Sequence, residues 1–136
     1  MALVVVELID VRVDLPSQFA VATLVETDAP YRKLEMPLGL PEANSLAYAL
    51  KRIETSRPIT HELIVKCLSK FNIEVLVVRV TGRAKGIYSA EMELGSPRGR
   101  EVVDCRPSDA MTVGLRCAVR PPILLEEKLF DDANDV

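Results

Sequence analysis

The sequence contains one histidine, His61, and Glu62 follows it directly. An imidazole can accept or donate a proton near neutral pH, which makes His61 with Glu62 a candidate for general acid–base catalysis. A metalloprotease of the His-Glu-x-x-His type needs a second histidine four positions after the first, and Val65 stands there instead. The alternative interpretation is that His61 is a polar surface or packing residue in the first turn of a helix.

Carboxylates offer a second kind of chemistry. Metal-assisted phosphodiester cleavage uses clustered acids to hold one or two hydrated cations, with Mg²⁺ or Mn²⁺ expected here and no organic cofactor. The acidic residues near expected loops or helix starts are Glu42, Glu62, Asp104, Asp109, Glu126 and Glu127. The run from Glu126 to Lys128 contains an acid-x-Lys triplet, but such triplets arise by chance when 27% of residues are charged. The alternative is an ordinary solvated helix face.

Two Arg-Pro dipeptides, at 57–58 and 106–107, stand at expected helix starts. Arg57 and Arg106 could clamp a phosphate beside the free N–H groups of a helix N-terminus. The alternative is structural, with each arginine pairing with a carboxylate such as Glu42 or Asp109 and fastening a helix to a loop. Other familiar sites are absent from the sequence, which has no structural zinc spacing, no Gly-x-Ser-x-Gly and no phosphate-binding Gly-Lys-Ser/Thr.

Hydrophobic periodicity predicts the elements that position these residues. Apolar and polar residues alternate over 9–15 and 34–38, and 19–26 is rich in strand formers, which predicts an antiparallel meander of three strands. A helix is expected from Pro41 to Ile53. A second helix is expected to be capped by Thr60. Its apolar stripe is Ile64, Cys67, Leu68 and Phe71.

In the second half of the chain, three predicted strands are again followed by a predicted helix. Residues 73–80 predict a central strand, and 88–94 with 101–105 predict a hairpin. Ser108 is placed to cap a helix over 109–118, which is apolar almost all round and therefore buried. Residues 123–125 predict a last strand. The order β-β-β-α-α-β-β-β-α-β predicts an α+β domain whose largely antiparallel or mixed sheet has about seven strands packed with three main helices.

The length of 136 residues is enough for one domain with its own core, expected over 1–130 with a frayed acidic tail at 131–136. The net charge of −3 argues against a protein that grips nucleic acid through bulk positive charge. A modest basic cluster remains, which is either a phosphate-contacting edge or a solvated hairpin end. It consists of Arg79, Arg83, Lys85, Arg98 and Arg100.

The cysteines and the N-terminus predict the compartment. Cys67, Cys105 and Cys117 lie far apart in apolar contexts, which predicts buried free thiols in a reducing cytoplasm. The apolar N-terminal run is interrupted by Glu7 and Asp10 and has no basic segment before it, so no signal peptide is expected. No apolar stretch approaches the length of about 18 residues that a membrane span needs.

Four segments carry a family resemblance. They are LEMPLGLPEA at 34–43, RPITHEL at 57–63, GIYSA at 86–90 and CRPSDAMTVGLR at 105–116. In order and spacing they resemble the bifunctional nuclease domain family, from about residue 3 to residue 130. Two positions depart from that family, because Pro37 stands where members usually have tryptophan and Glu35 where they usually have proline.

The resemblance implies an α+β domain that commonly forms homodimers and cleaves both DNA and RNA. The matched polar residues divide into candidates for catalysis and candidates for substrate binding. The catalytic candidates are His61, Glu62, Asp109 and Glu42, and the substrate-binding candidates are Arg57, Arg106, Thr60 and Ser108. The resemblance assigns no metal ligand.

Two hypotheses from different classes follow. A metal-assisted nuclease requires the candidate side chains to converge in one cleft, with water activated by a carboxylate-bound cation or by His61. A non-catalytic dimeric binding or regulatory module requires Arg57 and Arg106 to be paired inside the fold. In that second case the apolar helix over 109–118 is expected to support the dimer or partner surface.

Overall fold

The computed structural model describes residues 2–14, 16 and 19–132. The elements within these residues follow the expected order, and a short helix follows the last strand. They are β1 (Leu3–Asp14), β2 (Phe19–Glu26), β3 (Lys33–Leu38), α1 (Leu40–Leu50), α2 (Thr60–Lys70), β4 (Glu74–Ala84), β5 (Ile87–Ser96), β6 (Gly99–Cys105), α3 (Pro107–Arg116), β7 (Ile123–Glu126) and α4 (Leu129–Asp132).

The strands form one seven-stranded sheet in the order β3-β2-β1-β7-β4-β5-β6. All neighbouring strands run antiparallel except β4 and β7, which are parallel and align Val78 with Ile123 and Val80 with Leu125. The chain leaves the edge strand β6 through α3 and returns to the middle of the sheet as β7. The expected α+β class with a mixed sheet and an N-terminal meander is therefore confirmed.

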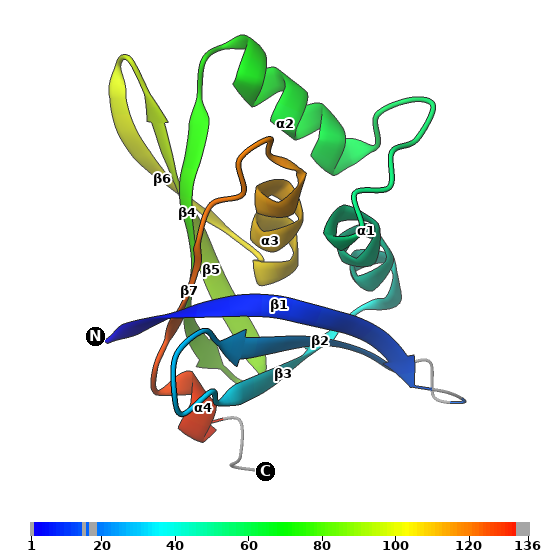
Figure 1. The fold of residues 1–136 in the computed structure, drawn as a ribbon, viewed down its shortest axis with the longest axis vertical. Helices are drawn as coiled ribbons and strands as arrows, with labels where there is room; N and C mark the ends of the chain where they lie inside the picture. The colour runs from blue at the N-terminus through cyan, green and yellow to red at the C-terminus, as the bar shows by residue number, and fades with distance from the viewer. Residues whose placement is uncertain (1, 15, 17–18, 133–136) are drawn as a thin grey trace.

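The three long helices pack together on one side of a bent sheet. In Figure 1, β1 to β3 form one wall, β4 to β7 form the other, and α3 lies in the angle between them. Helix α3 contacts β4 and β5 as well as α1 and α2, while α1 contacts β1 and β2. The sheet thus holds α3 in place, and α3 in turn positions the other two helices.

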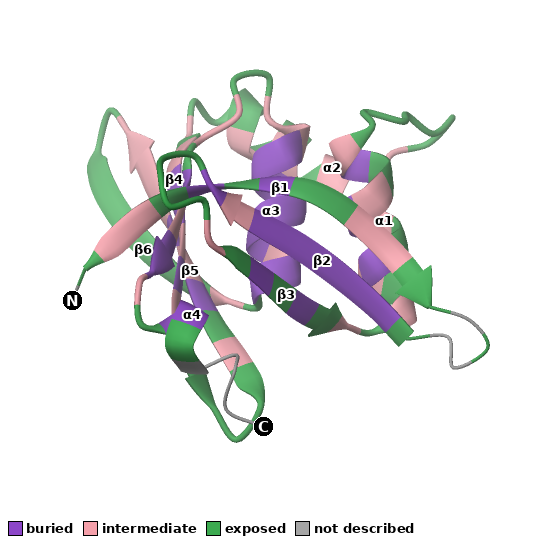
Figure 2. Ribbon diagram, turned by 60° about the horizontal axis from the view of Figure 1, so that its bottom comes forward, coloured by how far each residue is buried: buried purple, intermediate pink, exposed green. Residues whose placement is uncertain are grey.

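Helix α3 is the buried helix that its apolar sequence predicts. Eight of its residues are buried, and Figure 2 shows the buried colour along most of the helix. Its close packing depends on Gly114. A Cβ on Gly114 would lie 3.3 Å from Val78 and 3.2 Å from Pro121, so the helix approaches β4 more closely than a larger residue would permit. The expectation that this helix supports a dimer or partner surface is wrong, because the chain itself covers it.

Helix α2 lies at the surface and buries no residue completely. Val65 and Leu68 pack against the core, whereas Ile64, Cys67 and Phe71 are exposed, with Phe71 exposing 77% of its surface. The predicted apolar stripe is therefore wrong, because the helix contacts the core through a face narrower than the predicted stripe, centred on Val65 and Leu68. The expectation of buried thiols fails as well, since Cys67 is exposed and Cys105 and Cys117 are half-buried, all three being free.

The helix ends differ from those expected. Ile59 and Arg106 hold the N-cap positions, no side chain caps either helix, and Thr60 and Ser108 lie inside them. A capping residue must keep a non-helical backbone, which neither hydroxyl residue has here. Helix α1 ends at Leu50, short of Ile53, because Arg52 adopts a left-handed φ of 54°.

The C-terminal end of the described chain is helical. Asp131 and Asp132, the expected start of a frayed tail, belong to α4, and residues 133–136 lie outside the described part. Among the described helices, none is both long and apolar enough to cross a membrane.

Candidate functional site

The histidine and one of the candidate carboxylates are in direct contact. His61 Nε2 lies 2.9 Å from Asp109 Oδ1, although the two residues belong to different helices. His61 is the second residue of α2 and Asp109 the third residue of α3, so each lies in the first turn of its helix. The packing of α2 on α3 brings these two turns together.

Arg106 connects this pair to a third helix. Its Nε donates to Asp109 Oδ2 at 2.8 Å and its Nη2 donates to Asp109 Oδ1 at 3.1 Å, a two-pronged pairing typical of arginine with a carboxylate. Its Nη1 donates to Glu42 Oε1 at 3.1 Å, and Glu42 lies in the first turn of α1. The four side chains form a continuous row, Glu42–Arg106–Asp109–His61, which we call the polar row.

The first turns of three helices surround the polar row. Residues from the starts of α1, α2 and α3 line a pocket of about 120 Å³. The lining residues are Pro41, Glu42, Ser45, His61, Arg106, Ser108, Asp109 and Thr112. The start of a helix carries a partial positive charge and unpaired N–H groups, which favour an anion, and the carboxylates of Glu42 and Asp109 already lie at two of the three helix starts.

The absence of a side chain at Gly39 makes room for the carboxylate of Glu42. Gly39 is the N-cap of α1, and a Cβ at this position would collide with the Glu42 carboxylate, which folds back over it. Glycine leaves the space that Glu42 needs to reach Arg106. The Gly-x-x-Glu spacing therefore places a carboxylate at the pocket rather than in solvent.

The electrostatics of the row keep Asp109 ionised. The hydrogen bond from Arg106 holds the pKa of Asp109 below its ordinary value, and the contact with His61 acts in the same direction against the effect of burial. The same bond raises the pKa of Arg106, so the guanidinium stays charged. Burial, with Asp109 nearby, raises the pKa of the Cys105 thiol to about 11.

Not all candidate residues meet at the polar row. The structure brings together Glu42, His61, Arg106, Ser108 and Asp109. Glu62 instead lines a separate pocket on the other side of the first turn of α2. Arg57 and Thr60 are exposed and do not line the polar-row pocket, and the backbone carbonyl of Arg57 accepts a hydrogen bond from Thr55.

Sequence reasoning missed two hydroxyl residues of the pocket. Ser45 follows Glu42 by three positions and Thr112 follows Asp109 by three, so each pair shares one face of a helix. Thr112 is fully buried and donates from Oγ1 to the Ser108 carbonyl at 2.6 Å. Helical spacing from the acidic residues was the signal that could have identified both.

The other candidate carboxylates and the basic cluster lie elsewhere. Glu126 pairs with Lys128 at 3.3 Å, and Glu127 pairs with Arg32 at 2.8 Å. In the basic cluster, Arg79 pairs with Glu91 and Glu93, and Arg100 lies within 3.5 Å of Glu93. The acid-x-Lys triplet is therefore part of local ion pairs, and so are two arginines of the basic cluster.

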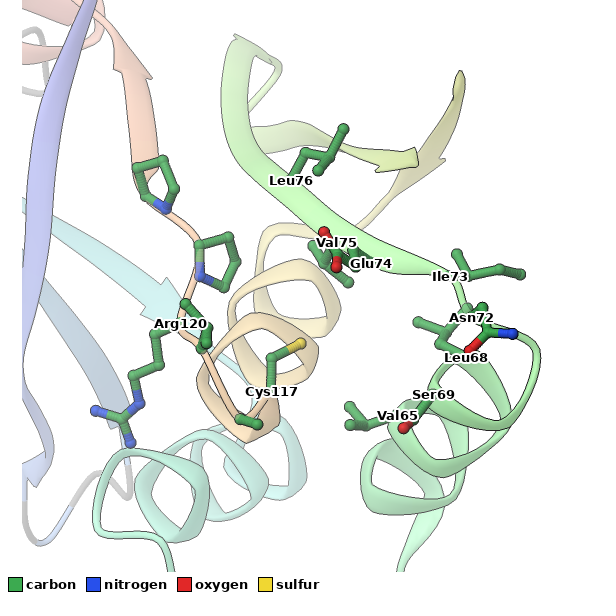
Figure 3. A pocket seen from close by; sticks show the side chains of 14 residues that line it. Val65, Leu68, Ser69, Asn72, Ile73, Glu74, Val75, Leu76, Cys117 and Arg120 are labelled. Carbon is green, nitrogen blue, oxygen red and sulfur yellow. The ribbon is translucent and has the colours of Figure 1, made fainter. Parts of the chain in front are cut away.

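A larger pocket lies away from the polar row. It measures about 600 Å³ and lies between α2, the start of β4 and the segment 117–122 (Figure 3). Aliphatic side chains and prolines make up most of its lining, and Glu74, Cys117 and Arg120 are its titratable residues. No pair of catalytic groups meets in this pocket among the described residues, so its chemistry is that of an apolar groove.

The polar row does not match the donor set of a metal site. Within the described residues, no three Asp, Glu, His or Cys side chains come together in a way that could hold a metal ion. Arg106 already lies between the two carboxylates of the row, where its positive charge would repel a cation. The residues of the row by themselves therefore do not fit a Mg²⁺ or Mn²⁺ ion.

Several known proteins are similar in sequence to this chain. An uncharacterized protein of Mycobacterium tuberculosis is 30% identical over 130 residues, which cover 95% of this chain and 75% of that protein. Bifunctional nuclease 2 of Oryza sativa subsp. japonica is 32% identical over 76% of this chain, and Bifunctional nuclease 2 of Arabidopsis thaliana is 34% identical over 66%. The matched region spans 31% and 27% of the two plant proteins, so each is much longer than this chain.

The profile of the bifunctional nuclease domain matches residues 23–135, which include all four residues of the polar row. The chain therefore belongs to the bifunctional nuclease domain family.

Proposed function

We propose that this chain hydrolyses phosphodiester bonds in DNA and RNA, with the reaction centred on the polar row. The observation that carries the proposal is the contact between His61 and Asp109 beside a guanidinium, in a pocket lined by the first turns of three helices. Family membership and the names of the two plant relatives support a nuclease-type function.

His61 acts as the general base in this proposal. Because Asp109 is ionised and can only accept a hydrogen bond, His61 Nε2 must carry the hydrogen of the 2.9 Å contact. In the neutral ring, that leaves Nδ1 as an acceptor, and Nδ1 makes no hydrogen bond within the described residues. Asp109 then stabilises the imidazolium that forms when Nδ1 takes a proton from water.

Arg106 orients the phosphate. A guanidinium has five N–H donors, and the polar row uses three of them. Its side chain is 62% exposed, so the remaining donors can reach a phosphate oxygen in the pocket. The helix starts around it add partial positive charge where the transition state gains negative charge.

The proposed step is balanced without a cofactor. The water oxygen forms a bond to phosphorus while its proton passes to His61 Nδ1, and one phosphorus–oxygen ester bond breaks. The departing oxygen takes a proton from the imidazolium or from solvent. Assistance by Mg²⁺ or Mn²⁺ stays a prediction, which only the metal dependence of cleavage can test.

The test is a nuclease assay on single- and double-stranded DNA and RNA, run with Mg²⁺, with Mn²⁺ and with EDTA. His61→Ala and Asp109→Asn should each lower cleavage by about 10²-fold or more while the circular dichroism spectrum stays unchanged. Asp104→Asn is the matched control, because Asp104 is an exposed acid outside the pocket. Equal cleavage by all four proteins, or cleavage by none, would contradict the proposal.

The alternative is a non-catalytic dimeric binding or regulatory module. One observation favours it: Arg106 is paired with Glu42 and Asp109, as a structural arginine would be. In that case the same variants should lower thermal stability and leave any cleavage unchanged. Under both interpretations we expect a homodimer, as in the family, and a cytoplasmic protein. Light scattering on the purified chain tests whether it is a dimer.

A further inference from the structure

We propose that Arg116, Arg52 and Lys66 form a second phosphate subsite, which binds another phosphate of the same nucleic-acid strand. This inference rests on the proposed function, because it extends the path of the strand beyond the polar row. The three cations line a pocket of about 190 Å³ between α2, the end of α3 and the loop that follows α1.

Arg116 is the central observation. Its side chain is only 6% exposed, and its Nη1 donates to the carbonyl of Ile53. Its Nε and Nη2 are buried and have no hydrogen-bond partner. These two atoms form one edge of the guanidinium, the edge that receives two oxygens of a carboxylate or phosphate. Buried donors without a hydrogen bond are rare, and Glu62, the ion-pair partner of Nη2, lies too far away to accept one, so the edge can still receive a closer acceptor.

The charges of the pocket favour an anion. Arg116, Arg52 and Lys66 contribute three positive charges, against two negative charges from Glu54 and Glu62. Neither Arg52 nor Lys66 makes an ion pair within the part of the chain that the structure describes, and both are exposed at the rim. The rim can therefore attract a phosphate, and Arg116 can hold it.

The subsite lies next to the polar row. His61 and Glu62 are consecutive residues in the first turn of α2, and they line different pockets. The first turn of α2 thus separates the two sites, and one flexible strand can contact both sides of it. Arg106 and Arg116 stand at the two ends of α3, about 15 Å apart at a rise of 1.5 Å per residue, which a strand of a few nucleotides can span.

Glu62 closes the subsite in the structure as it stands. Its Oε1 lies 3.7 Å from Arg116 Nη2, beyond hydrogen-bond distance, and 3.3 Å from Thr55 Oγ1. A phosphate must displace this carboxylate to reach the buried edge of Arg116. The displacement breaks this ion pair and the hydrogen bond from Thr55, and the phosphate replaces the ion pair with charge-assisted hydrogen bonds to the same edge of Arg116.

Binding is measured without turnover, by fluorescence anisotropy of a labelled oligothymidylate of about twelve nucleotides in EDTA. Arg52→Gln with Lys66→Gln should weaken binding by about tenfold and lower the salt slope by about 0.7 for each cation removed. Lys70→Gln is the matched control, since Lys70 lies on the same helix outside the pocket. Arg116→Lys should also weaken binding, and its circular dichroism spectrum reveals any loss of folding.

The outcomes separate this inference from the proposed function. Unchanged affinity in the double variant, with wild-type binding and cleavage intact, overturns the subsite and leaves the nuclease proposal standing. No binding and no cleavage by the wild type overturns both. Inorganic phosphate serves as a further probe, with the NMR signal of the Arg116 Nε–H group as the readout. If phosphate shifts this signal and the oligonucleotide does not, the pocket binds free phosphate and not a strand, which overturns the inference.

Discussion

His61 and Asp109 are 48 positions apart in the chain, and their side chains are 2.9 Å apart in the fold. The distance is short because α2 and α3 start next to each other, with Arg106 holding the other side of Asp109. The carboxylate is thus bound on both oxygens, which orients the imidazole and limits its motion. This relationship links the Arg-Pro-Ser-Asp segment to the Arg-Pro-Ile-Thr-His segment.

The ionisation of Asp109 should make stability depend on pH. Arg106 lowers the pKa of Asp109 below its ordinary value of 3.8, so the folded state favours the charged form. This contribution is complete above the unfolded-state value and is lost as the pH falls through the lowered folded-state value. We expect the stability gap between wild type and Asp109→Asn to shrink as the pH falls.

Urea unfolding from about pH 6 to about pH 2 measures this gap. Asp104→Asn provides the reference, because Asp104 is exposed and makes no ion pair within the described residues. A gap that stays constant over the whole range would show that Asp109 contributes nothing through its charge.

Much of the fold could be predicted from the sequence, because its strands and its buried helix follow strong patterns. The apolar surface of α3 predicted burial, and the alternation around 34–38 predicted β3. The order of strands in the sheet could not be predicted, since the return of β7 to the centre depends on packing between distant segments. The apolar stripe predicted on α2 was wrong. Apolar residues at helical spacing predict a buried face, but α2 lies at the surface and its packing partners cannot be identified from the sequence.

The candidate site was predicted in part. Glu42, His61, Arg106 and Asp109 came from separate segments, and the sequence does not reveal that all four face one pocket. Glu62 follows His61 directly and was a catalytic candidate beside it, yet each step of one residue along a helix turns the side-chain direction by about 100°. That rotation takes Glu62 to the neighbouring pocket.

Gly39→Ala should disturb the polar row through Glu42. The new Cβ would collide with the carboxylate of Glu42 and push it away from Arg106. We expect cleavage to fall by about tenfold through a less ordered guanidinium, with little change in helix content. Initial rates on a single-stranded oligonucleotide measure the effect.

A double-mutant cycle identifies the cause. If Gly39→Ala acts through Glu42, it should have no further effect on a protein that already carries Glu42→Ala. An equal loss of rate in both backgrounds would show that the glycine acts on the backbone of α1 instead.

Cys67 and Cys105 should react at different rates. Cys67 is exposed on α2, whereas Cys105 is half-buried and its pKa is raised to about 11 by burial and by Asp109. Alkylation proceeds through the thiolate, so at about pH 8 Cys67 should be modified well before Cys105. Mass spectrometry of peptides from a timed iodoacetamide reaction measures both rates, and faster modification of Cys105 would contradict the described burial.

Glu62→Gln distinguishes the two interpretations of this residue. If Glu62 takes part in catalysis, as its position after His61 suggested, the variant should lose cleavage of a small phosphodiester such as bis(p-nitrophenyl) phosphate. If it closes the second phosphate subsite, removing its charge should strengthen oligothymidylate binding several-fold and leave the small substrate unaffected, because that substrate has a single phosphate. Affinity and kcat measured on the same preparation separate these outcomes, and weaker oligonucleotide binding with normal folding would contradict the subsite.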